Sequence, residues 1–157
     1  MLQHTAALCE SKPNAITIRA VEYLSHSVAD TEAIAANLAD SLQPGDVIAL
    51  EGELGAGKTQ FVRGLVKALG GDAKAVSSPT FVLLNVYQTP LLAVYHLDAY
   101  RVGGAEDFSS IGFTELLEQN GIVVVEWPSR VKEILPPKRI NITIEITGKS
   151  SRKITIN

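Results

Sequence analysis

The amino-acid sequence predicts an α/β domain of three layers, in which helices flank a central mixed β-sheet. Two runs made only of apolar residues, 47–50 and 122–125, indicate strands that are buried on both faces. Segments with helical spacing of apolar residues alternate with the strands, and two other strand-like segments are joined by a short link typical of a hairpin. The sheet is therefore expected to contain both parallel and antiparallel strands.

The first third of the chain predicts a strand at residues 15–20 and a helix that begins near residue 30. Asp30 or Thr31 is the expected cap of this helix, and the dipeptide that starts at Pro44 is expected to end it. Its apolar residues recur every four positions, which places them on one face. These residues are Ile34, Leu38 and Leu42.

The buried strand at 47–50 leads into a loop at 52–57 and then a helix at 58–69. That helix carries an apolar face and a basic face and ends at a pair of glycines. The apolar face consists of Phe61, Leu65 and Leu69, and the basic one of Arg63 and Lys67.

The second half of the chain predicts mostly strands. Segments 81–87 and 91–98 form the expected hairpin, and a short helix at 114–119 precedes the buried strand at 122–125. Isoleucine at every second position of 140–146 is typical of a strand with one exposed face. A further edge strand is expected at 153–156.

Composition excludes several classes of protein. The formal charge of −3 over 157 residues argues against a uniformly basic nucleic-acid binder. The single cysteine, Cys9, excludes an internal disulfide and a multi-cysteine zinc site. No apolar run approaches the roughly 18 residues of a membrane span, and residues 1–13 lack a signal-peptide pattern. We therefore expect a soluble, cytoplasmic protein of one domain with no membrane partner.

The charge is unevenly distributed. Residues 1–127 hold 7 basic and 15 acidic residues, whereas residues 128–157 hold 7 basic and 2 acidic ones. Such a basic segment is typical either of a docking face for an acidic partner or RNA, or of a strand edge protected by solvated lysines. The residues considered for docking are Arg130, Lys132, Lys138 and Arg139.

Residues 52–59 match the phosphate-loop pattern G-x-x-x-x-G-K-[ST] at every fixed position. Glycines let the backbone curl until several N–H groups point at one phosphate, and the helix that follows offers the positive end of its dipole. The predicted nucleotide site comprises Gly52, Glu53, Leu54, Gly55, Ala56, Gly57, Lys58, Thr59 and Gln60. Lys58 is the expected ligand of the β- and γ-phosphates, and the Thr59 hydroxyl is an expected ligand of Mg²⁺. Because no N-K-x-D segment for guanine is present, ATP is the favoured nucleotide.

A second group of candidate residues follows neighbouring strands. Glu126, at the end of 122–125, is the candidate second ligand of Mg²⁺, with capping of the next helix as the alternative. Asp98, at the end of 91–98, is expected to bind the metal through water or to orient the attacking water. Thr80 is a candidate contact of the γ-phosphate or part of an ordinary polar loop, and Trp127 packs either against adenine or in the core. His96 is interpreted as a structural histidine.

With these residues assembled, the chain resembles the TsaE (YjeE) family of bacterial phosphate-loop ATPases. The likeness spans roughly residues 30–136 and rests on LEGELGAGKTQFVRG (50–64), SPTF (78–81), HLDAYR (96–101) and EW (126–127). Gln60 stands where the family usually has threonine, and Ala99 where leucine is typical. We expect residues 1–157 to form a single phosphate-loop ATPase domain, in which 1–26 are an N-terminal extension with the first strand and 137–157 are basic C-terminal strands that match no family motif closely.

The resemblance also implies a function. It implies that Thr59 and Glu126 bind Mg²⁺, that Asp98 and Thr80 belong to the active site, and that the protein takes part in forming threonylcarbamoyladenosine at position 37 of tRNAs that read codons beginning with A. The implied partner is the TsaD–TsaB heterodimer, with tRNA engaged indirectly. Because the only arginine next to a proposed catalytic residue is Arg101, we expect slow ATP hydrolysis alone and faster hydrolysis with partners. The alternatives are a non-catalytic adaptor that senses ATP, and a small-molecule kinase.

Overall fold

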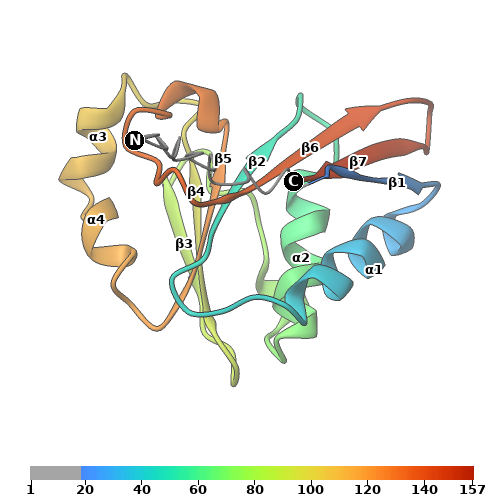
Figure 1. Cartoon of the computed structure of the whole chain (residues 1–157), viewed down its shortest axis with the longest axis horizontal. Coiled ribbons are helices and arrows are strands. Elements are labelled where there is room, and N and C mark those ends of the chain that lie inside the picture. Colours follow the sequence, from blue (N-terminus) through green and yellow to red (C-terminus); the bar gives the residue numbers. More distant parts are fainter. Residues whose placement is uncertain (1–18) are drawn as a thin grey trace, which may run out of the picture.

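The computed structural model describes residues 19–157, and a mixed sheet of seven strands forms its centre (Figure 1). Cys9 lies outside the described residues. In spatial order the strands run β1, β7, β6, β2, β5, β4, β3. Their bounds are Val21–Ser25 (β1), Val47–Glu51 (β2), Leu84–Tyr87 (β3), Ala93–Asp98 (β4), Gly121–Glu126 (β5), Ile140–Ile146 (β6) and Arg152–Ile156 (β7).

The four strands at the centre, β6, β2, β5 and β4, are parallel, and antiparallel strands complete the sheet at both sides. Strands β2 and β5 correspond to the two apolar runs of the sequence, and every residue of β5 is buried. Strands β3 and β4 form the expected hairpin, but β3 begins at Leu84 instead of residue 81, because residues 80–82 form a turn, and β4 begins at Ala93 instead of residue 91. The prediction of a mixed sheet is confirmed.

Helices cover both faces of this sheet, so the predicted three-layer architecture is also confirmed (Figure 1). One face packs against α1 (Val28–Ala39) and α2 (Lys58–Ala68) around a core that includes Phe61 and Leu65. The other packs against α3 (Ala105–Ser110), α4 (Phe113–Leu116) and the 3₁₀ turn η2 (Pro128–Arg130). A second 3₁₀ turn, η1 (Ala73–Ala75), follows α2. Within the described chain, no helix is long and apolar enough to cross a membrane.

The first strand differs from the prediction. Residues 15–18 of the expected strand lie outside the described residues, and Arg19 and Ala20 precede β1 instead of belonging to a strand. Four of the five residues of β1 are exposed, because this strand is the outer edge of the sheet. An edge strand with little burial has no strong apolar alternation for sequence analysis to detect.

Helix α1 starts earlier than expected, and its cap is Ser27, not Asp30 or Thr31. The Ser27 hydroxyl accepts a hydrogen bond from the Asp30 amide at 3.0 Å, while the Asp30 carboxylate accepts one from the His26 amide at 2.8 Å. The helix ends at Ala39, before the turn at Pro44. Reciprocal bonds of this kind satisfy amides that the first turn leaves without partners.

Three further predictions need correction. Helix α3 was not expected, since its six residues are too few to show a helical period, and α4 begins at Phe113 and is shorter than the predicted helix. Strand β7 is not an edge strand, because β1 pairs with its outer side and β6 with the other. The lysine-rich end of the chain therefore lies inside the sheet, which alternation along one strand cannot reveal.

Candidate functional site

The loop between β2 and α2 has the geometry of a phosphate-binding loop. Gly55 and Gly57 adopt φ angles of 82° and 105°, in the left-handed region that favours glycine. Gly52 lies so close to β6 that a Cβ on it would be 2.9 Å from the Ile144 carbonyl oxygen. A side chain at any of these three positions would therefore strain the loop or displace it.

Lys58, the first residue of α2, folds back over this loop. Its ammonium group donates hydrogen bonds to the carbonyl oxygens of Gly52 and Glu53, the latter at 3.2 Å, and lies 4.4 Å from the centre of the Trp127 ring. Burial lowers the pKa of Lys58, and the neighbouring carboxylates, Glu126 and Asp98 foremost, partly oppose that shift. The lysine is thus a buried cation next to two acids.

Those two acids are neighbours in the sheet. Asp98 ends β4 and Glu126 ends β5, and the parallel register pairs them directly. Because β2, β4 and β5 end at the same edge, the phosphate loop and both carboxylates meet in one cavity of about 550 Å³. Both acids are almost completely buried, at 2% and 3% exposure. Glu126 therefore lies beside the loop as the sequence predicts.

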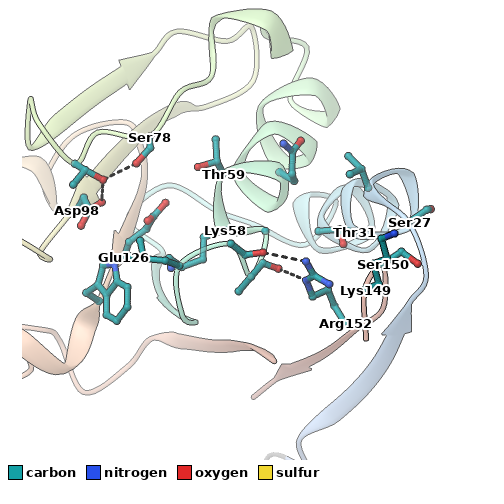
Figure 2. A pocket seen from close by; sticks show the side chains of 18 residues that line it. Ser27, Thr31, Lys58, Thr59, Ser78, Asp98, Glu126, Lys149, Ser150 and Arg152 are labelled. Atoms are coloured by element: carbon teal, nitrogen blue, oxygen red, sulfur yellow. Dashed lines mark hydrogen bonds between the residues drawn. The ribbon is translucent and has the colours of Figure 1, made fainter. Parts of the chain in front are cut away.

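Asp98 is held on both of its oxygens. Thr80 donates its hydroxyl proton to Oδ2 at 2.7 Å, and the Tyr100 amide donates to Oδ1 at 2.8 Å. The Thr80 hydroxyl also forms a 2.7 Å hydrogen bond with the hydroxyl of Ser78. Figure 2 shows the two hydrogen bonds that connect Ser78 to Asp98. The structure thus brings Thr80 and Asp98 into direct contact, although 18 residues separate them.

Glu126 is held by His96, which is completely buried. His96 Nε2 lies 2.8 Å from Glu126 Oε1, and the other ring nitrogen, Nδ1, has no hydrogen-bond partner among the described residues. The hydrogen bond engages one carboxylate oxygen of Glu126, and Oε2 remains available to a ligand. His96 is buried as a structural histidine would be, but one of its ring nitrogens has no partner among the described residues and the other contacts the candidate metal ligand.

Trp127 lies at the same end of the cavity. Its backbone adopts a left-handed φ of 56°, and its ring packs against Tyr100, with 5.0 Å between ring centres, as well as against Lys58. The side chain therefore covers the Lys58 ammonium from one side. Its contact with adenine stays a prediction.

The opposite end of the cavity is formed by residues that the sequence did not single out. They come from the start of α1 and from the turn before β7, and Figure 2 shows them on the far side of the phosphate loop from Asp98. Arg152 donates to the carbonyl oxygens of Ala56 and Gly55, at 2.9 and 3.0 Å. Nearly a hundred residues separate these partners, and no local motif marks them. The other residues at this end are Ser27, Val28, Thr31, Lys149 and Ser150.

The residues present suit Mg²⁺. Thr59 and Glu126 line the same cavity, and both offer the oxygen ligands that this ion prefers. Within residues 19–157 no group of three or more acidic, histidine or cysteine side chains could enclose a metal. Mg²⁺ is usually held in proteins by one or two carboxylates together with waters and phosphate oxygens.

Apart from Arg152, the arginines of the predicted basic and catalytic segments point elsewhere. Arg101 stacks on the exposed ring of Phe81 at 4.3 Å, and Arg130 lies 5.6 Å from the centre of the Tyr100 ring. Arg139 bonds to the Pro136 carbonyl and to Asn141. None of these three arginines lines the cavity.

The chain is similar to proteins of one family over most of its length. The family described as "Threonylcarbamoyl adenosine biosynthesis protein TsaE" matches residues 25–154. Two proteins named "tRNA threonylcarbamoyladenosine biosynthesis protein TsaE" are among its relatives. The one from Bacillus subtilis is 40% identical over 80% of this chain and 78% of its own, and the one from Treponema pallidum is 39% identical over 85% and 97%. The crystal structure of Bacillus subtilis YdiB superposes with a TM-score of 0.72 and 33% identity, over 88% of this chain and 84% of the other.

Proposed function

The chain belongs to the TsaE family, and from that premise we propose that it binds and hydrolyses ATP with Mg²⁺ during threonylcarbamoyladenosine formation on tRNA. One observation carries this proposal. A phosphate loop, a buried lysine and two adjacent buried carboxylates line a single cavity. This is the set of groups that phosphoryl transfer to water requires, since that reaction depends on positioning and charge neutralisation.

The proposal fixes the direction of the bound nucleotide. Lys58, Thr80 and Asp98 gather at one end of the cavity, so the γ-phosphate would lie there. The nucleoside would then extend toward the end formed by Thr31 and the turn before Arg152. In this orientation Trp127 shields Lys58, and the proposal favours this contact over adenine stacking, one of the two roles that the sequence left open. The fluorescence of Trp127 would then report on the position of the Lys58 ammonium.

Mg²⁺ would be held by Thr59 and Glu126, with His96 fixing one oxygen of that glutamate. When bound, the ion neutralises charge on the β- and γ-phosphates. Glu126 is suited to this role because His96 contacts only Oε1, which leaves Oε2 available to the ion. These assignments match the ligands expected from the sequence.

Asp98 would orient the attacking water. Its two oxygens each accept one hydrogen bond from the protein, which leaves a lone pair on each for a water molecule. No arginine of the catalytic end points into the cavity, because Arg101 and Arg130 stack on aromatic rings. We therefore propose that turnover is slow for the isolated chain and is raised by the TsaD–TsaB heterodimer. A contribution in trans reaches about 10³–10⁵-fold in related enzymes.

The experiment that tests the proposal uses the single tryptophan of the chain. Addition of Mg-ATP should draw the Lys58 ammonium away from the Trp127 ring and change the fluorescence, and Lys58→Ala should abolish the response. ATP turnover is then measured alone and with the purified heterodimer. Equal turnover in both conditions would overturn partner activation, and absence of nucleotide binding would overturn the whole proposal.

Asp98→Ala separates an ATPase from an adaptor that only senses ATP. If hydrolysis is required, this variant binds ATP and the heterodimer but no longer supports tRNA modification. If modification persists without hydrolysis, the chain acts as an adaptor.

The exposed lysines of the basic segment are the proposed contact with the heterodimer or with tRNA. Lys132 and Lys138 are exposed, whereas Arg139 is engaged within the chain. Charge reversal of both lysines should weaken complex assembly and reduce its salt dependence. Unchanged assembly and unchanged salt dependence would assign them to a solvated surface.

A further inference from the structure

Arg63, on α2, joins that helix to the segment that carries Thr80. Every donor nitrogen of its guanidinium group has a partner inside the chain. Nε donates to the Ala73 carbonyl at 3.1 Å and Nη2 to the Val76 carbonyl at 3.0 Å, while Nη1 donates to the Gln60 side-chain oxygen at 2.6 Å. Two backbone bonds and one side-chain bond from one planar group fix both its position and its orientation.

The backbone that Arg63 holds leads directly to Asp98. Val76 precedes the segment 77–80, and the hydroxyl of Tyr87 holds Ser77 at both its amide and its carbonyl, at 3.2 and 3.0 Å. Four residues after Val76, Thr80 reaches Asp98. The position of the Thr80 hydroxyl therefore depends on two anchors, one on α2 and one on β3.

The third bond of Arg63 is to a residue of the cavity lining. Gln60 lines the cavity directly after Thr59, and its side-chain oxygen receives the shortest of the three hydrogen bonds. The guanidinium thus connects a residue of the phosphate end of α2 to the backbone that positions Thr80. A lysine ammonium at this position lacks the planar fork that reaches three acceptors in fixed directions.

We propose that Arg63 is a positioning residue that holds the 77–80 segment against Asp98, with Gln60 setting the orientation of its guanidinium. The expected effect of Arg63 on turnover rests on the proposed function. Without the arginine, Thr80 and Asp98 lose their fixed geometry while the phosphate loop itself stays intact. Turnover should therefore fall with little change in the affinity for ATP.

The test compares Arg63→Met and Arg63→Lys with the control Lys67→Met, which removes an exposed lysine from the same helix. ATP affinity is measured from Trp127 fluorescence, and turnover is measured with the heterodimer present. For Arg63→Met we expect a fall in kcat of roughly 10- to 100-fold, as for loss of charge-assisted hydrogen bonds, and a change in affinity below about threefold. Arg63→Lys should recover only part of the loss, and the control should match the unchanged protein.

Amide hydrogen exchange provides a readout that does not require turnover. In the isolated chain, Arg63→Met should accelerate exchange at residues 73–80 by roughly tenfold or more, while the phosphate loop and β5 retain their protection. Unchanged exchange in 73–80, or a loss of ATP affinity as large as the loss of kcat, would overturn the positioning role. If Arg63→Met does not fold, Arg63→Lys is judged by the same two measurements. A chain that hydrolyses no ATP in any form refutes the proposed function, and the exchange result still decides whether Arg63 holds the segment.

Discussion

Helices α1 and α2 pack so closely that a single added methyl group should separate them. Gly64, in the middle of α2, faces α1, and a Cβ at this position would lie 2.5 Å from the Glu32 carbonyl oxygen, 2.7 Å from the Glu32 Cα and 2.9 Å from the Ala35 Cβ. Ordinary contact starts near 3.4 Å. Because two of these atoms belong to the backbone, the clash cannot be relieved by rotation of a side chain, and Gly64→Ala must move one helix.

The expected cost follows from two opposing contributions. Overpacking of a well-packed core costs about 1–3 kcal/mol, and the backbone contacts at Gly64 place this case near the upper end. Alanine in place of glycine inside a helix regains about 1 kcal/mol. The net loss in the free energy of unfolding is therefore about 2 kcal/mol, or a melting temperature lower by about 4–8 °C for a domain of this size.

Thermal and urea unfolding followed by circular dichroism would measure this loss. The matched control is Gly103→Ala, since Gly103 is exposed and its added Cβ would meet only the Asp107 side chain, at 3.3 Å. That variant should stay within about 0.5 kcal/mol of the unchanged protein. A Gly64→Ala protein that melts at or above the original temperature would refute the argument. Because Ser27 and Thr31 of α1 line the cavity, the same variant should also bind ATP more weakly.

Three further predictions concern the site. Burial lowers the pKa of Lys58 from its usual value of 10.5. The charged lysine therefore lowers the free energy of unfolding at neutral pH, and this loss should disappear as the pH rises from the lowered pKa to 10.5. ATP affinity, which needs the ammonium, should decline over the same alkaline window in a titration followed by fluorescence, and a constant affinity would contradict this. Thr80→Val should lower kcat by roughly 10-fold or more, because Asp98 loses a hydrogen-bond donor, whereas Thr80→Ser should retain activity. Equal kcat for both variants would contradict the role of the Thr80 hydroxyl. His96→Phe leaves Glu126 buried without its hydrogen-bond partner, so the free energy of unfolding in urea should fall by about 1–3 kcal/mol. Half-maximal turnover should also need more Mg²⁺. An unchanged Mg²⁺ requirement would mean that His96 contributes only to packing.

Local patterns in the sequence predicted most of the elements around the site. The apolar runs 47–50 and 122–125 became β2 and β5, and the glycine-rich motif became the loop between β2 and α2. Both acids were expected at strand ends, and both lie there. These predictions succeed because each depends on residues that are close together in the chain. A buried strand, a glycine-rich loop and an amphipathic helix each have a characteristic local residue pattern.

Other features depend on pairing between distant segments, and these were missed or misplaced. Strand β7 was expected at an edge because its own alternation is the same in either position, and only its pairing with β1 places it inside. Helix α3 is too short for a period to be visible. Ser27 was overlooked as the cap of α1 since both Asp30 and Thr31 have suitable side chains nearby.

The sequence by itself determined that this chain carries a phosphate loop, that Lys58 and Thr59 belong to it, and that the sheet is mixed and covered on both faces. Only the tertiary structure decided that Glu126 is bonded to His96, that Thr80 meets Asp98, and that Arg152 holds the loop from the far side. The physical reason is the range of each interaction. Loop curvature and burial depend on neighbouring residues, whereas a hydrogen bond between residues 18, 30 or 96 positions apart forms only after the whole sheet has brought distant strands and their loops together.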